Sequence, residues 1–387
     1  MNVFLKISPI TLIWLGFYFR LLSSIWSVDF GLHLIFTGDV GRFHGMAVAL
    51  NNNEDILFGN SILGGYGYPY FLSFLYKISM ESIFIGAIAS SLAWLLSGFV
   101  LIRTLNFFFL TRANFLILIF LYTFLPSIVL NTSLPMRESY LLLFVNLTIY
   151  SLLKIYLHKD ARYWLLMPLC IFILSIFHPA YLPFGMMALI LVVFSYALRG
   201  KRIVNQRNIF IFVPFFLVSL FFIYDTFYNL FSEYAYNLDY GGISGAVSTF
   251  REGSVITAPN ARAQYQSSVE EIDGMLGLIT FLPVLLFQYL FEPMPWKISS
   301  LVDFVLLVEN VIRGILIFFA LKALFSKSTP MRRLLFILII LYFIMEFIWA
   351  LGTTNWGTAS RHHVPIFGVL LIIGIAFTNQ PDKKYAV

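Results

Sequence analysis

Long apolar runs separated by short polar connections dominate this chain. A helix needs about 20 predominantly apolar residues to cross the hydrocarbon core of a membrane, and ten runs suit that role. They are 10–28, 83–102, 114–130, 139–157, 163–177, 180–198, 209–224, 304–321, 334–351 and 364–378. The pattern predicts an all-α, polytopic integral membrane protein, with residues 1–387 forming a single transmembrane domain.

Lysine and arginine gather in five segments: 103–112, 154–162, 199–207, 322–333 and 383–384. Short cytoplasmic loops carry an excess of these residues, so the five segments are expected to share one side. About ten spans with both termini cytoplasmic satisfy this, provided that two more broken apolar stretches, 66–79 and 276–291, do not cross. We therefore predict that these two are re-entrant or interfacial helices. Irregular backbone at membrane depth survives only where protein or a wet cavity surrounds it, which predicts a cavity on the outer side.

The same assignment predicts which segments lie outside. The longest, 225–275, is acidic and rich in Gly and Ser, and suits either a mobile lid or a solvated surface loop. The other outer segments are 29–60, 131–138, 178–179, 292–303 and 352–363.

Composition agrees with a membrane protein and excludes an ordinary soluble one. The chain is 60% hydrophobic and only 11% charged, against about 25% charged in soluble domains. The net charge of +6 is spread over the basic connections, so no nucleic-acid partner is expected. The single cysteine, Cys170, excludes an intrachain disulfide.

The first outer loop contains the candidate residues Asp39, Arg42 and His44. In a helix, Asp39 and Arg42 share a face at positions i and i+3. A carboxylate here suits a general base that takes the proton of a sugar hydroxyl. The alternative is an aspartate that caps a surface helix.

A second candidate group opens the span at 139–157. Arg137 and Glu138 follow Pro135 at the outer mouth of this helix. Arginine offers a planar fork for phosphate oxygens, and a helix N-terminus adds partial positive charge, so the place suits a diphosphate. The alternative is an interfacial arginine paired locally with Glu138. His178 closes a short outer turn, where a substrate-binding role competes with an ordinary turn histidine.

The last outer loop holds the most concentrated polar group of the chain. Arg361, His362 and His363 stand together before the final span, with Asn355 upstream. An arginine with adjacent histidines can bind a diphosphate and assist a leaving group. Adjacent histidines on a helix rarely aim at one ion, so neither a metal nor another cofactor is expected.

Charged residues inside spans are costly and therefore suggest function. Arg20 falls in the first span and Glu346 near the outer end of the span at 334–351. Glu309 and Arg313 are expected to form an ion pair at positions i and i+4.

Asp39, the Met-Arg-Glu of 136–138 and the Asn-Trp-Gly to Arg-His-His stretch of 355–363 together resemble bacterial surface-polysaccharide polymerases of the Wzy type. In layout the chain also resembles the GT-C glycosyltransferases, which put an essential acid in the first outer loop, as Asp39 would be. It departs from both, because Glu138 stands where such polymerases often have Gln, and the soluble C-terminal domain common in GT-C enzymes is not expected within residues 1–387.

The resemblance implies an enzyme in the bacterial inner (plasma) membrane that joins undecaprenyl-diphosphate-linked oligosaccharides of an O-antigen or capsule at the outer face. Arg137 and Arg361 would hold the diphosphate, His362 or His363 would assist its departure, and Asp39 or Glu138 would serve as base. A chain-length regulator is an optional further partner besides the lipid bilayer. The alternatives are a GT-C glycosyltransferase that uses a polyprenyl-phosphate sugar, and a lipid-linked oligosaccharide flippase or other transporter.

Overall fold

The computed structural model describes residues 7–29, 37–53, 67–108, 110–197, 274–326 and 329–376, with the short pieces 247–248, 251–252 and 263–265. Within these residues the secondary structure is helical apart from one isolated β-bridge. The predicted span at 209–224, the basic segments 199–207 and 383–384 and most of the loop 225–275 lie outside the described residues.

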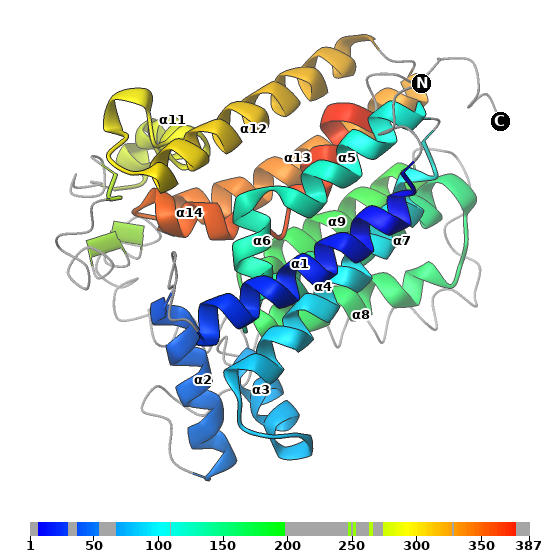
Figure 1. Cartoon of the computed structure of the whole chain (residues 1–387). Coiled ribbons are helices and arrows are strands. Elements are labelled where there is room, and N and C mark those ends of the chain that lie inside the picture. The colour runs from blue at the N-terminus through cyan, green and yellow to red at the C-terminus, as the bar shows by residue number, and fades with distance from the viewer. Residues whose placement is uncertain are drawn as a thin grey trace.

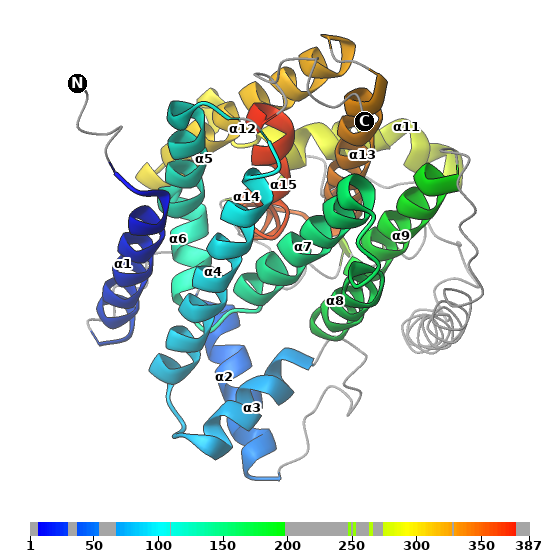
Figure 2. The same cartoon turned by 90° about the vertical axis from the view of Figure 1, so that its right-hand side faces the viewer.

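Helices from the first half of the chain form one side of the bundle (Figures 1 and 2). Helix α4 packs against both α1 and α7, and α7 packs in turn against α8. The helices of this half are α1 (Pro9–Asp29), α4 (Ile83–Leu105), α5 (Arg112–Phe124), α6 (Pro126–Ser133), α7 (Glu138–Leu153), α8 (Tyr163–Phe177) and α9 (Tyr181–Ala197).

The second half adds helices that close the bundle around the end of the chain. Helix α12 packs on the C-terminal π-helical turn η6, and α13 contacts α9, α11 and α12. These elements are α11 (Gly274–Phe291), η5 (Pro295–Lys297), α12 (Leu301–Ser326), α13 (Thr329–Gly352), α14 (Trp356–His362), α15 (Phe367–Leu371) and η6 (Ile372–Ala376).

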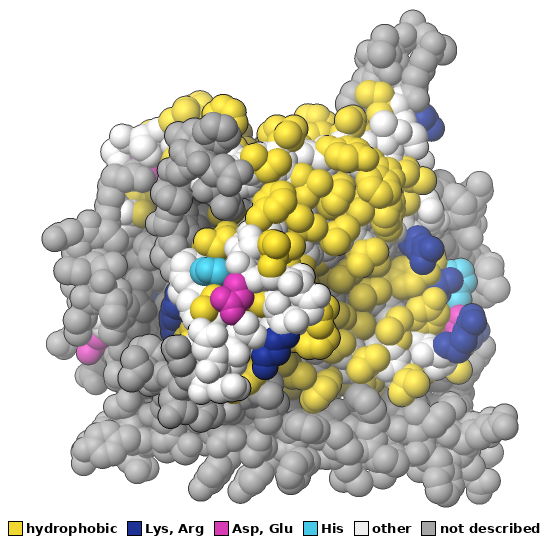
Figure 3. All heavy atoms as spheres, turned by 60° about the horizontal axis from the view of Figure 1, so that its bottom comes forward, with side chains coloured by type: hydrophobic (Ala, Val, Ile, Leu, Met, Phe, Trp, Pro, Cys, Tyr) yellow, Lys and Arg dark blue, Asp and Glu magenta, His cyan; other side chains and the backbone are white. Residues whose placement is uncertain are grey.

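Five of the described helices are long and apolar enough to cross a membrane, or seven if each of two bent helix pairs counts as one span. The chain is therefore a multi-pass membrane protein, while ten full spans are not shown. The stretches 163–177 and 180–198 form α8 and α9, which are apolar but shorter than the other candidates. A broad hydrophobic surface separates the charged side chains in Figure 3, as lipid contact requires.

One predicted straight span is bent, and a second bend lies at the start of another. The span at 114–130 breaks between α5 and α6 with an angle of 49°, and an angle of 75° separates α14, in the predicted loop 352–363, from α15 at the start of the final span. Pro126 starts α6 and Pro365 lies in the second break. Proline lacks the backbone N–H that a continuing helix needs, and this explains both bends.

The predicted ion pair between Glu309 and Arg313 is wrong. Glu309 of α12 accepts hydrogen bonds from the backbone N–H of Ser127, at 2.8 Å, and from its hydroxyl. It therefore caps the N-terminus of α6 from another helix. Arg313 instead donates to the carbonyl of Leu290, at 3.0 Å, and to the side chain of Asn310. Both charges serve the contacts between helices.

Arg20 is fully buried in α1, as its place in the first span predicts. Its guanidinium donates to the Thr132 hydroxyl at 2.6 Å and to the Thr123 carbonyl at 3.1 Å, and lies 3.4 Å above the centre of the Trp94 ring. These contacts join α1 to α4, α5 and α6, so Arg20 is explained as a residue that holds helices together.

Helices α2 (Thr37–Asn51) and α3 (Gly67–Ile78) form a hairpin at one end of the bundle (Figure 1). Helix α3 buries Tyr68, Leu72 and Tyr76 on one face. A Cβ at Gly67 would overlap the backbone carbonyl of Ile176 in α8, so the bare glycine lets α3 lie close to the bundle. The stretch predicted to be a re-entrant or interfacial helix is thus a helix.

The basic connections lie at the opposite end of the helices. The ends of α4, α5, α8 and α12 bring Arg103, Arg112, Arg162 and Lys322 there, while Glu138 begins α7 at the hairpin end. We call these the basic end and the site end. This arrangement agrees with the loop assignment from the sequence, since the predicted cytoplasmic connections in the described residues share one end.

Candidate functional site

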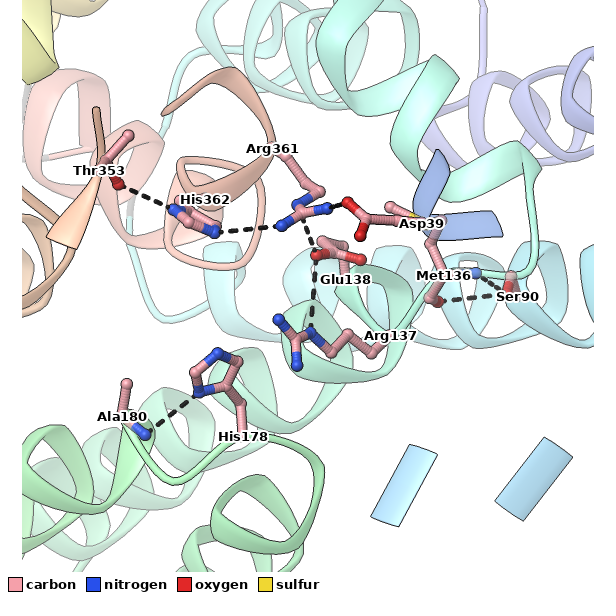
Figure 4. Close-up of polar contacts among 10 residues, drawn as sticks. All are labelled: Asp39, Ser90, Met136, Arg137, Glu138, His178, Ala180, Thr353, Arg361 and His362. Atoms are coloured by element: carbon pink, nitrogen blue, oxygen red, sulfur yellow. Dashed lines mark hydrogen bonds and ion pairs between the residues drawn. The ribbon is translucent and has the colours of Figure 1, made fainter. Parts of the chain in front are cut away.

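An ion-pair cluster at the site end joins residues that are far apart in the sequence (Figure 4). Arg361 of α14 pairs with Asp39 of α2 through Nη1, and its Nε lies 3.2 Å from Glu138 Oε1 of α7. Arg361 and Glu138 are buried, whereas the Asp39 side chain is 35% exposed. One guanidinium thus bridges two carboxylates, one inside the protein and one at its surface.

Arg137 approaches the same carboxylate from the other side. Its Nε lies 3.9 Å from Glu138 Oε1, and its guanidinium lies 5.5 Å from the centre of the Phe43 ring of α2. Pro135 and Met136 shape the approach, because the Met136 backbone shares a hydrogen bond with Ser90 of α4. Burial lowers the pKa of Arg137, and the Glu138 charge opposes that effect. The neighbouring carboxylate therefore supports the charge of the guanidinium.

His362 extends the cluster on the other side of Arg361. Its Nε2 lies 3.5 Å from Arg361 Nη2, and its Nδ1 lies 3.1 Å from the Thr353 hydroxyl. The imidazole stacks on Trp349 of α13, with 3.8 Å between ring centres. This contact fixes the ring plane, so His362 is held at the edge of the arginine.

His178 reaches the same group through Trp349, whose ring centre is 4.8 Å away. Its Nδ1 accepts a hydrogen bond from the Ala180 backbone N–H, at 3.2 Å. Burial lowers the pKa of His178 well below its usual value, and the nearby Arg137 charge lowers it further. His178 is therefore neutral, with Nδ1 as the acceptor and Nε2 carrying the proton.

His363 faces away from the cluster, although it follows His362 directly. Its Nδ1 lies 2.9 Å from Glu346 Oε2, and its Nε2 lies 3.1 Å from the Tyr289 carbonyl oxygen. The Tyr289 carbonyl can only accept, so Nε2 carries a proton, and Nδ1 and Glu346 share one proton in a buried hydrogen bond. The two predicted catalytic histidines are thus separated, and His363 joins α11, α13 and the end of α14.

Three other predicted substrate-binding residues occupy different places. Asn355 caps α14, because its side-chain oxygen accepts from the Thr358 N–H at 2.7 Å. His44 contacts the Tyr76 hydroxyl at 2.8 Å within the α2–α3 hairpin. Arg42 lies exposed on α2, the helix that carries Asp39. Asn355 and His44 therefore have local structural partners.

Two described pieces of the long loop 225–275 lie against the connection after α13. The backbone of 263–265 pairs with that of 354–356, through bonds of 2.9 Å and 3.0 Å. Arg251, which is 2% exposed, donates to the carbonyl oxygens of Leu351 and Thr353, each at 3.4 Å. The described residues 251 and 263–265 therefore contact the residues that precede Arg361.

Trp349 and Thr353 are site neighbours that the sequence did not single out. Trp349 lies in the last turn of α13 and Thr353 directly follows that helix, close to the predicted site residues in the next connection. A tryptophan at the outer end of a span is common in membrane proteins as an interface anchor. Only the packed structure distinguishes this one, because its ring holds His362 and His178.

The cluster leaves one strong acceptor open. Glu138 Oε2 is buried and has no hydrogen-bond partner in the described part of the protein, while Oε1 faces both arginines. A buried acceptor without a donor is unfavourable, so this oxygen suits a donor that a bound molecule supplies. Among the described residues no group of three His, Cys, Asp or Glu side chains is arranged to hold a metal ion.

No protein-family model matches this chain, and neither a curated protein nor a solved structure matches it.

Proposed function

We propose that the protein is a glycosyltransferase that polymerises undecaprenyl-diphosphate-linked oligosaccharides at the outer face of the bacterial inner membrane. The observation that carries the proposal is the convergence of Arg137 and Arg361 on Glu138, with Asp39 on the outer side of Arg361. Paired guanidinium groups suit a diphosphate, and the two carboxylates suit activation of a hydroxyl. Placement of the site opposite the basic end supports an outer-face reaction.

In the proposed reaction, an acceptor hydroxyl oxygen bonds to the anomeric carbon of the donor sugar. The bond from that carbon to the diphosphate oxygen breaks, and the diphosphate leaves with the electron pair. Arg137 and Arg361 stabilise the charge that develops on the leaving group, and His362 positions Arg361 through its Nε2 contact. The hydroxyl proton passes to Asp39 or to the open Oε2 of Glu138.

A fixed group of charged side chains of this kind accelerates a reaction mainly by positioning the reactants and stabilising the developing charge. The diphosphate would compete with Asp39 for Arg361, and Asp39 is the only partly exposed member among Asp39, Glu138 and Arg361. Binding of the donor would therefore release Asp39, which becomes available to the acceptor hydroxyl.

The first test is the surface-glycan ladder of a strain that lacks the gene. Polymerisation predicts loss of long chains, with lipid core capped by a single repeat. A ladder that keeps its length but lacks one sugar or branch would replace the proposal by the GT-C alternative, single-sugar transfer from a polyprenyl-phosphate donor. Accumulation of lipid-linked repeats on the inner leaflet would favour a flippase.

A further inference from the structure

Two adjoining cavities form a groove between α12 and the broken helix pair α5–α6. The upper cavity, of about 390 Å³, lies between the start of α12, α6 and α14, and Ser360 lines it next to Arg361. The lower cavity, of about 370 Å³, continues between α5 and α12. Pro126 and Val305 line both cavities. Each volume lies within the ~300–1,000 Å³ usual for small-molecule sites.

The lining is mostly apolar throughout the groove, and its few polar groups lie almost all in the upper cavity. The upper cavity includes Asp303, Asn355 and Ser360, whereas the lower one is lined by hydrophobic side chains apart from Glu309. Glu309 is already bonded to Ser127 and so adds no free charge. This distribution matches an amphiphile whose polar end lies beside α14 and whose hydrocarbon chain runs along α12.

The lower cavity opens toward the hydrocarbon of the membrane. Three side chains at its rim are exposed, namely Phe120 (44%), Phe304 (53%) and Val308 (44%). They lie on exposed faces of α5 and α12, and α12 is one of the candidate membrane spans. Hydrocarbon is the medium that such a surface meets, so an occupant can enter from the bilayer without crossing water.

The 49° break at Pro126 creates the space. A straight helix over the same residues would keep α5 in line with α6. The bend instead changes the helix direction at Pro126, the residue at which both cavities meet. Glu309 stabilises the break by capping α6. The groove therefore results from the bend, which this cap holds in place.

We infer that this groove binds the isoprenoid chain of the lipid-linked donor, with Val305 at its centre. The inference rests on the proposed function, which supplies a donor whose diphosphate would bind Arg361 of α14, the helix whose Trp356, Thr358 and Ser360 line the upper cavity. An acyl chain of a bilayer phospholipid is the competing occupant that the experiment must separate.

The probe is a polyprenyl diphosphate without glycan that carries a diazirine in its chain, added to the purified full-length protein. Illumination is expected to give adducts that mass spectrometry maps to 120–130 and 301–312. A phospholipid with a diazirine in its acyl chain serves as the comparison. Adducts of the polyprenyl probe elsewhere, or equal labelling of the groove by the phospholipid probe, would overturn the inference.

Val305→Trp, which fills the groove, should lower polyprenyl labelling about tenfold. Val311→Trp is the matched control, because Val311 is an exposed valine of the same helix that does not line either cavity. It should label like the wild-type protein, and a loss in both variants would count against the groove. The wild-type adduct map holds even if Val305→Trp fails to fold. Groove adducts with an unchanged glycan ladder would instead reject the polymerase proposal and keep the lipid site.

Discussion

Asp39 and Arg361 form an ion pair although 322 positions separate them in the sequence. The pair joins the α2–α3 hairpin to the last outer connection, and Arg361 keeps a second carboxylate partner in Glu138. Asp39 is therefore the partner that can leave without stranding the buried arginine. A substitution of Asp39 can therefore lower activity without lowering the stability of the fold.

Asp39→Asn should lower polymerisation by about a hundredfold or more, since general-base catalysis contributes ~10²–10⁴ in rate. The thermal midpoint of the purified protein should change little, because Arg361 retains Glu138. Asp160→Asn, at a half-buried acid paired with Arg162 at the basic end, is the matched control and should leave activity unchanged. Full activity of Asp39→Asn would exclude Asp39 as the base.

Arg361→Lys should lower activity by about a hundredfold, the scale of losing one donor to a developing anion. An ammonium group cannot contact two carboxylates and a diphosphate with the fork that a guanidinium provides. Transfer assays with a purified lipid-linked repeat would measure the loss. Arg162→Lys, at the basic end, should be silent, and wild-type rates for Arg361→Lys would contradict the assigned site.

His363 and Glu346 should affect stability more than chemistry. Loss of the proton-sharing partner of a buried polar group costs about 1–3 kcal/mol, so Glu346→Gln alone should lower the thermal midpoint. The double variant Glu346→Gln with His363→Asn should regain part of that loss. The rate per folded molecule should stay near wild type in Glu346→Gln, whereas a large fall there would return His363 to a catalytic role.

The neutral state of His178 should make stability depend on pH. Its pKa in the folded protein is lowered, so below about pH 6.5 the unfolded chain binds a proton that the folded protein does not. Stability should therefore fall as the pH drops through that value, by at most about 1.4 kcal/mol per unit from this group. His178→Asn, which keeps an acceptor for the Ala180 N–H, should show a smaller fall in thermal midpoint between pH 7.5 and 5.5. An identical fall would show that His178 titrates normally.

Gly67→Ala should displace α3, because the added Cβ would overlap the backbone carbonyl of Ile176. Overpacking of this kind costs about 1–3 kcal/mol, and movement of the hairpin would shift Asp39 away from Arg361. Activity should fall together with the thermal midpoint. Gly45→Ala is the control on the same hairpin, since a Cβ there meets nothing within 4 Å. Equal behaviour of both variants would show that the close contact is unimportant.

The apolar pattern predicted where helices form better than it predicted their course. Helices α4, α7, α12 and α13 fall on predicted spans, because long apolar runs leave a lipid-soluble helix as the main solution. The bend at Pro126 was missed, since proline in a span is compatible with either a kink or a continuing helix. Resolution of that choice required the partner residue Glu309, which lies far along the chain.

The candidate site was predictable in its charged members and not in its geometry. Concentrated polar residues in predicted outer loops pointed to Asp39, Arg137, Glu138 and Arg361, which the structure brings together. Because His362 and His363 are adjacent in the sequence, both were assigned to one site. Successive side chains on a short helix point in different directions, and the structure separates the two. Asn355 and Trp349 show the same limit, since capping and ring stacking depend on neighbours that spacing does not reveal.

The cap of α6 by Glu309 has a consequence for biosynthesis. The acceptor for the Ser127 N–H lies 182 positions further along the chain, and at about 5–20 residues per second its synthesis follows only after roughly 10–40 s. During that interval the first helices sit in the bilayer with an unfinished helix end. Completion of the first half of the bundle therefore depends on a residue that is synthesised late. A ribosome stalled before α12 would leave a membrane intermediate that quality-control proteases can attack.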